Sequence, residues 1–103
     1  MKYYLLSDNI DTKIGMRLSG IDGIVVHDTK EFQKAFDMAV SNKSIAILLI
    51  TQKLAKLDPV RIEKQKMSSQ APLIVEIPDR HGSIKSDNYI LNYVKDAIGL
   101  KAQ

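Results

Sequence analysis

The sequence predicts an α/β domain built on a four-stranded parallel sheet with helices on its faces. Short apolar runs recur along the 103 residues, and segments with helical periodicity separate them. In those segments apolar residues recur three and four apart, which is typical of amphipathic helices. Strict alternation of strands and helices implies right-handed crossovers between parallel strands. The apolar runs are residues 3–6, 23–26, 45–50 and 73–77.

The first unit, residues 3–26, is predicted to form a strand, a helix and a second strand. Apolar and aromatic residues fill positions 3–6, and the turn-forming Ser7-Asp8-Asn9 ends them. A short helix is expected over residues 12–18, with Gly20 as its stop. Residues 23–26 then form the second strand.

A longer helix follows the second strand. Asp28 and Thr29 are both suitable N-caps, and Glu31 stands three residues after Asp28, as in a capping box. The expected end is Ser41-Asn42. The buried face should carry Phe32, Ala35, Phe36, Ala39 and Val40.

Residues 45–50 contain no polar side chain, which predicts a central strand with helices on both sides. Thr51 is expected to cap the next helix. Pro59 marks either a turn or the first position of a helical segment that runs to Lys66.

The fourth strand, residues 73–77, ends at Pro78, which has no N–H to donate to a strand ladder. A loop is expected over residues 79–83. A C-terminal helix should occupy residues 86–99, capped by Ser86 or Asp87. Residues 1–103 are thus expected to form a single Rossmann-like α/β domain. The expected strand order is 2-1-3-4, a flavodoxin-like or receiver-like core with strands 2 and 4 at the edges.

The formal net charge of +3 lies in the second half of the chain. Residues 53–66 hold five basic and two acidic residues, a mixture that favours a solvated helix face over a nucleic-acid surface. Cysteine is absent, and no apolar run approaches the roughly 18 residues of a membrane span. We therefore expect a cytoplasmic protein that neither inserts into a membrane nor binds nucleic acid.

The sequence lacks the residue patterns that most kinds of catalytic site require. Asp8 and Asp28 end neighbouring strands, as in a phosphoacceptor receiver, but Thr51 stands where the acceptor carboxylate would be. We expect these two aspartates to cap helices. The alternative is a receiver-like regulatory domain that binds Mg²⁺ or a small ligand at the strand ends. Glycine-rich phosphate loops and a G-x-S-x-G elbow are absent, and His27 and His81 lack metal-ligand spacing. Hence no catalytic, cofactor or metal residue is assigned.

Glu76 is unusual because it interrupts an apolar strand. A carboxylate there needs a cation or several N–H donors. Lys53, Arg17 and helix N-termini are candidates. Two interpretations stay open: an internal salt bridge or cap, and a contact with a partner chain.

The C-terminal helix carries an interaction signal. Tyr89 and Tyr93 lie four residues apart, beside an apolar face expected to meet the sheet. Tyrosine is enriched at interfaces, although these two could equally extend the core. The apolar face comprises Ile90, Val94, Ala97 and Ile98.

Several segments, taken together, resemble the F subunit of V-type and A-type rotary ATPases, which is called the G subunit in some bacterial sodium pumps. Residues 15–21, G-M-R-L-S-G-I, are similar to the family's G-F-R-L-A-G-I. Residues 45–51, I-A-I-L-L-I-T, resemble I-G-I-I-L-I-T. Residues 72–78 read P-L-I-V-E-I-P, as in the family, and residues 94–100 resemble V-K-x-A-I-G-I. Asp79 departs from the basic or small residue often found there.

The resemblance implies a non-catalytic subunit of the central stalk, or rotor. Such a subunit binds the coiled-coil D subunit and helps couple ATP hydrolysis or synthesis to hydrogen-ion or sodium transport. The catalytic ring of A and B subunits and the subunit connecting stalk to membrane are its other implied neighbours, with a peripheral place on the membrane. Our hypothesis for the partner interface comprises Glu76, Ile77, Pro78, Asp79, Tyr89 and Tyr93.

Overall fold

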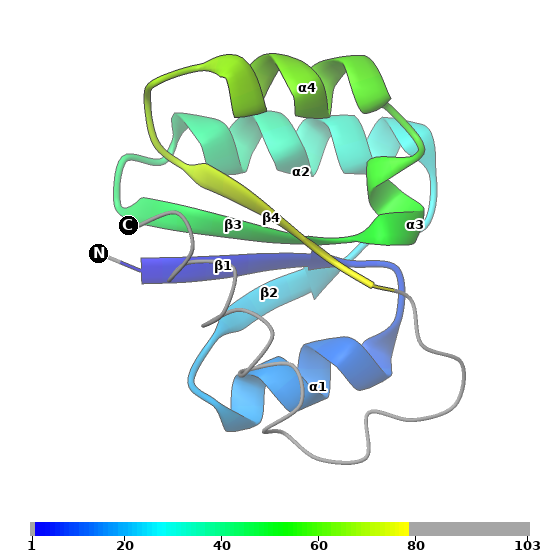
Figure 1. The fold of residues 1–103 in the computed structure, drawn as a ribbon. Helices are drawn as coiled ribbons and strands as arrows, with labels where there is room; N and C mark the ends of the chain where they lie inside the picture. Colours follow the sequence, from blue (N-terminus) through cyan, green and yellow to red (C-terminus); the bar gives the residue numbers. More distant parts are fainter. Residues whose placement is uncertain (1, 79–103) are drawn as a thin grey trace.

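The computed structural model describes residues 2–78, in which four strands alternate with helices (Figure 1). The predicted loop over residues 79–83 and the predicted helix over residues 86–99 lie outside the described residues. The elements in chain order are β1 (Lys2–Ser7), α1 (Ile10–Leu18), β2 (Asp22–Val25), α2 (Thr29–Ser41), β3 (Ile45–Thr51), α3 (Gln52–Ala55), α4 (Pro59–Met67) and β4 (Leu73–Ile77).

The four strands form one parallel sheet in the order β2-β1-β3-β4, which confirms the predicted topology. Leu5 lies opposite Gly23 on one side and Leu49 on the other, and Leu49 lies opposite Val75. Helices α2 and α4 cover one face of the sheet, and α1 lies against the other (Figure 1). Strand β3, whose residues 45–50 are all apolar, is central, as a strand buried on both faces should be.

Side chains that alternate along the strands form two separate cores. Leu6 and Leu48 point to the core beneath α2, α3 and α4, where Phe32 and Phe36 pack with ring centroids 5.7 Å apart. Leu5 points the other way, to a smaller core that includes Met16 of α1. The period of two thus divides one apolar strand between both faces of the sheet. Other members of the smaller core are Ile21, Ile47, Leu49, Val75 and Ile77.

Helix α1 begins at Ile10, two residues before its predicted start, because Asn9 is its N-cap. The Asn9 Oδ1 atom accepts a hydrogen bond from the Thr12 N–H at 2.7 Å. At the other end the chain reverses at Gly20, whose φ of +84° suits glycine. The Ile21 N–H then donates to the Met16 carbonyl at 3.0 Å. Both ends of the helix are therefore fixed by short-range hydrogen bonds.

The caps of the later helices match the sequence pattern in part. Asp28 caps α2 by accepting from the Glu31 N–H at 2.7 Å, but Glu31 Oε1 accepts from His27 N–H instead of Asp28 N–H. The return hydrogen bond to Glu31 therefore comes from the residue before the N-cap and not from the N-cap itself. Thr51 occupies the N-cap position of α3, as predicted, but its side chain makes no capping hydrogen bond to that helix. Pro59 is the first residue of α4, one of its two predicted roles.

Candidate docking surface

Open parallel sheets bind ligands at the carboxyl ends of their strands. At this end of the sheet, the hydroxyl groups of Ser7 and Thr51 form hydrogen bonds with backbone groups. Ser7 is fully buried; its Oγ donates to the Asn9 carbonyl at 2.8 Å and accepts from the Asn9 N–H at 3.0 Å. Thr51 Oγ1 accepts from the Asp8 N–H at 3.3 Å, which links the ends of β1 and β3. These bonds hold the loop after β1 in place and leave neither hydroxyl without a partner.

The two aspartates at the strand ends behave differently. Asp28 caps α2, as predicted, whereas the prediction that Asp8 caps α1 is wrong. Asn9 takes that position, and Asp8 Oδ1 accepts from the Asn9 side-chain amide at 3.3 Å. Among residues 2–78, no three histidine or carboxylate side chains gather closely enough to hold a metal ion.

Glu76 of β4 forms an ion pair with Lys66 of α4. Lys66 was not among the cations proposed from the sequence. It lies one helix earlier in the chain, and the parallel crossover brings the end of α4 back over β4. The Glu76 side chain keeps 30% of its surface exposed, so the carboxylate is half-buried, not enclosed in the core. The pair accounts for its charge and leaves one side open to solvent.

The remaining predicted interface residues divide at the boundary of the described chain. Ile77 is buried in the smaller core, so it supports the sheet. Pro78 is half-buried directly after the strand. Asp79, Tyr89 and Tyr93 lie outside the described residues.

The basic run over residues 53–66 does not present a uniform positive face. Arg61 binds Asp37 of α2 through two hydrogen bonds of 2.8 and 2.9 Å, and also reaches Asp58 at 3.1 Å. The hydrogen bond from the Arg61 side chain lowers the pKa of Asp37. Hydrogen bonds from the Arg61 N–H and the Gln33 amide lower the pKa of Asp58. With Lys66 on Glu76, these pairs tie α4 to α2 and β4.

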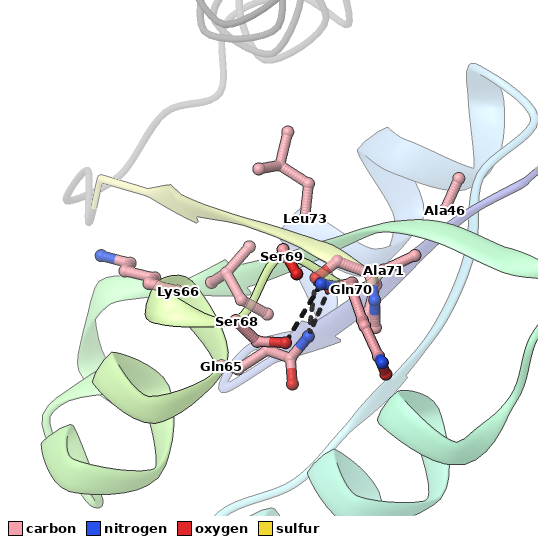
Figure 2. A pocket seen from close by; sticks show the side chains of 10 residues that line it. Ala46, Gln65, Lys66, Ser68, Ser69, Gln70, Ala71 and Leu73 are labelled. Carbon is pink, nitrogen blue, oxygen red and sulfur yellow. Dashed lines mark hydrogen bonds between the residues drawn. The ribbon is translucent and has the colours of Figure 1, made fainter.

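A shallow hollow lies at the opposite end of the sheet, where α4 leads into β4 (Figure 2). Gln65 donates from its side-chain amide to the carbonyls of Gln70 and Pro72, both at 3.1 Å, and the Gln70 N–H donates to Ser68 Oγ. Ala46 and Leu73, near the amino ends of β3 and β4, also line it. The polar groups of this hollow hold its own loop together, at the end of the sheet away from the usual ligand position.

Sequence reasoning missed an apolar row on the outside of α1. Ile10, Ile14 and Leu18 expose 54%, 52% and 70% of their surface, while Met16 on the same helix is buried. The signal was available: the three residues recur every four positions, which places them on one side of a helix. It was overlooked because the helix was expected to start at residue 12, which excluded Ile10.

Comparison with known proteins gives a consistent result across nearly the whole chain. Residues 4–94 match the protein family described as ATP synthase (F/14-kDa) subunit. Among residues 2–78, no helix has the length and apolar character needed to cross a membrane.

Individual relatives are all named as the F subunit of an A-type ATP synthase. The protein of that name in Methanocaldococcus jannaschii is 32% identical over 101 residues, which cover 97% of both chains. Its counterpart in Methanosphaera stadtmanae is 33% identical and covers 88% of this chain and 87% of its own. The counterpart in Thermococcus sibiricus is 27% identical, with 98% and 97% covered. The resemblance in the sequence motifs is thereby confirmed: this chain belongs to the family of ATP synthase F subunits.

Proposed function

We propose that this chain is a non-catalytic rotor subunit in the central stalk of an A-type or V-type ATPase. The family match over residues 4–94 carries this proposal. In that role the chain binds the coiled-coil D subunit and helps couple ATP turnover in the ring of A and B subunits to ion movement. It reaches the membrane only through the complex, by way of the connecting subunit.

The strand ends support a role without chemistry of its own. The hydroxyls of Ser7 and Thr51 are occupied by backbone hydrogen bonds, and Asp28 caps a helix. A receiver-like site for Mg²⁺ needs carboxylates that are free to converge on the ion. Asp8 alone of the predicted pair does not cap a helix. We therefore favour a binding subunit over the receiver-like alternative.

The proposed contact surface on the β4 side follows the sequence hypothesis. Its described part consists of Pro78 and of Glu76, which is partly exposed beside Lys66. Ile77 supports it from the smaller core. Asp79, Tyr89 and Tyr93 complete the surface in this proposal.

Co-purification with the D subunit of the same organism tests the function. Co-expression of the two chains, with an affinity tag on the D subunit only, should yield a stable complex of one copy each by size-exclusion chromatography with light scattering. Tyr89→Ala and Tyr93→Ala should reduce the recovered fraction. Undiminished recovery would remove the tyrosines from the interface, and no complex with the wild-type chain would overturn the function.

A titration separates the receiver-like alternative from the stalk subunit. Mg²⁺ and then acetyl phosphate are added to the isolated chain while backbone amide shifts are recorded. The stalk function predicts no saturable response at Asp8 or Asp28. A saturable response confined to those loops would favour the receiver-like domain.

A further inference from the structure

Helix α1 is apolar on two sides, and only one of them packs against the rest of residues 2–78. Thr12, Gly15 and Met16 are buried against the sheet. Ile10, Ile14 and Leu18 form a second row that faces solvent. Among residues 2–78, the other exposed large apolar residues are scattered over β1, α2, the α3–α4 connection and α4, and none forms a comparable row. Exposed apolar side chains gathered in one place indicate a binding surface.

We propose that this row, the α1 ridge, is a docking site for one helix of the coiled-coil D subunit. This inference rests on the function proposed above and names the surface and the contact it makes. Side chains four residues apart form the ridges that interdigitate when two helices pack. From Ile10 to Leu18 the ridge is about 12 Å long, which corresponds to two turns of a partner helix.

Charges beside the ridge define the chemistry of the partner. Lys13 and Arg17 are also four residues apart, so they form a basic row parallel to one side of the ridge. Asp11 lies on the other side, in the first turn. In the described part of the chain, none of these three takes part in an ion pair. The helix that fits is therefore apolar along its seam, with acidic residues on the side that meets Lys13 and Arg17.

The size of the ridge favours a long partner over a second copy of this chain. Three side chains from each of two copies would bury far less than the roughly 1,200 Å² typical of a stable interface. A coiled coil can extend beyond α1. Ile10 follows the carboxyl end of β1 by three residues, and Pro78 follows the carboxyl end of β4, so both lie at the same end of the parallel strands. In Figure 1 the start of α1 and the end of β4 lie at the same end of the molecule.

The test compares apolar-to-charged changes on two helices of the full-length chain. Ile14→Glu and Leu18→Glu alter the ridge. Val60→Glu and Met67→Glu on α4 are matched controls, because these residues are 76% and 79% exposed and seven positions apart. Affinity for the purified D subunit is measured by isothermal titration calorimetry. Ile14→Gln and Leu18→Gln serve as milder variants, and circular dichroism with thermal melting checks that every variant is folded.

If the α1 ridge binds the D subunit, each ridge variant should bind it about tenfold more weakly or worse, because one apolar side chain that the complex buries is lost. The α4 controls should bind within about twofold of wild type. Arg17→Glu should also weaken binding and reduce its dependence on salt.

Three results would overturn the proposal that the α1 ridge binds the D subunit. In the first, the wild-type chain binds the D subunit and the folded ridge variants bind equally well; the proposed function then stands without this surface. In the second, the α4 controls weaken binding as much as the ridge variants. In the third, the isolated chain is a dimer that Ile14→Glu makes monomeric while affinity for the D subunit is kept; the occupant is then a second copy. Failure of the wild-type chain to bind at all would instead overturn the proposed function, and the ridge with it.

Discussion

Lys66, near the end of α4, and Glu76 of β4 form an ion pair that joins a helix to the edge strand following it. The connection between the two elements bends back through Ser68 and Pro72, so the pair joins residues that are ten positions apart in the sequence. Both side chains are about one-third exposed, 35% for Lys66 and 30% for Glu76. Water therefore screens the attraction, and the pair positions β4 more than it stabilises the whole fold.

A double-mutant cycle measures this pair. Lys66→Met and Glu76→Gln are made singly and together, and urea unfolding is followed by circular dichroism. We expect a coupling free energy of about 0.5–1 kcal/mol, typical of a partly exposed ion pair. The coupling should shrink in about 1 M NaCl, because salt screens exposed charges. Strictly additive effects at low salt would contradict the contact.

Acid should weaken the junction between α2 and α4. Arg61 lowers the pKa of both Asp37 and Asp58 in the folded chain below the ordinary value of 3.8. A lowered folded-state pKa adds stability that is complete above the unfolded-state pKa and is lost as the pH falls through the folded-state pKa. The stabilisation by this junction is therefore fully present at neutral pH, begins to fall at about pH 4, and is lost as the pH drops through the lowered pKa values of the folded chain.

The measurement is the urea midpoint between about pH 6 and pH 2.5, for the wild-type chain and for Asp37→Asn with Asp58→Asn. The double variant should be less stable at pH 6 and should lose less stability on acidification. Lys64→Met, on the same helix and without a partner role in this junction, is the control and should keep the wild-type slope. Equal slopes for the wild-type chain and the double variant would contradict the prediction.

Gly23 and Gly20 should both resist replacement by alanine, but for different reasons: a close neighbour at Gly23 and a positive φ at Gly20. A Cβ atom at Gly23 would lie 2.6 Å from both the Cβ and the carbonyl oxygen of Leu5, its neighbour in the sheet. A Cβ at Gly20 would meet nothing within 4 Å, but φ there is +84°. Gly23→Ala must push β2 away from β1 and should cost about 1–3 kcal/mol. Gly20→Ala should cost about 1–2 kcal/mol.

Chemical denaturation of both variants tests this comparison. Amide exchange gives a second readout, because only Gly23→Ala should raise exchange across the β1–β2 ladder. An unchanged ladder in Gly23→Ala would show that Leu5 does not hold β2 as closely as described.

The cap of α1 provides another discriminating pair of variants. Asn9→Ala removes the acceptor of the 2.7 Å bond from the Thr12 N–H and should cost about 1 kcal/mol. Asp8→Ala removes only an acceptor for the Asn9 amide at 3.3 Å and should cost less than half of that. Thermal melts at equal pH compare the two. A larger loss of stability from Asp8→Ala than from Asn9→Ala would show that Asp8, and not Asn9, caps α1.

The sheet could be predicted from sequence because local signals and topology agree. The all-apolar run at 45–50 required a central position, and the order β2-β1-β3-β4 supplies one. Pro78 marked the end of β4, which stops at Ile77. Asp28 was identifiable as a cap because an amphipathic helix starts at once after it.

Predictions failed where a side chain had a choice of partners. Thr51 could have capped α3, but its hydroxyl accepts from the Asp8 N–H on the neighbouring strand, a partner 43 positions away. Glu76 needed a cation, and the crossover geometry selected Lys66. Asn9 took the cap expected of Asp8, since both residue types serve equally well and only the chain path decides between them. Such selections depend on distances that sequence spacing does not contain.

The fixed ends of α1 have a mechanical consequence. Its first turn is held by Asn9 and Ser7 at the end of β1, and its last by the Ile21 N–H just before β2. A sideways force on its outer surface would therefore be transmitted through these hydrogen bonds to the ends of the two adjacent strands. In the stalk role proposed above, this attachment would let a load on α1 reach the sheet directly.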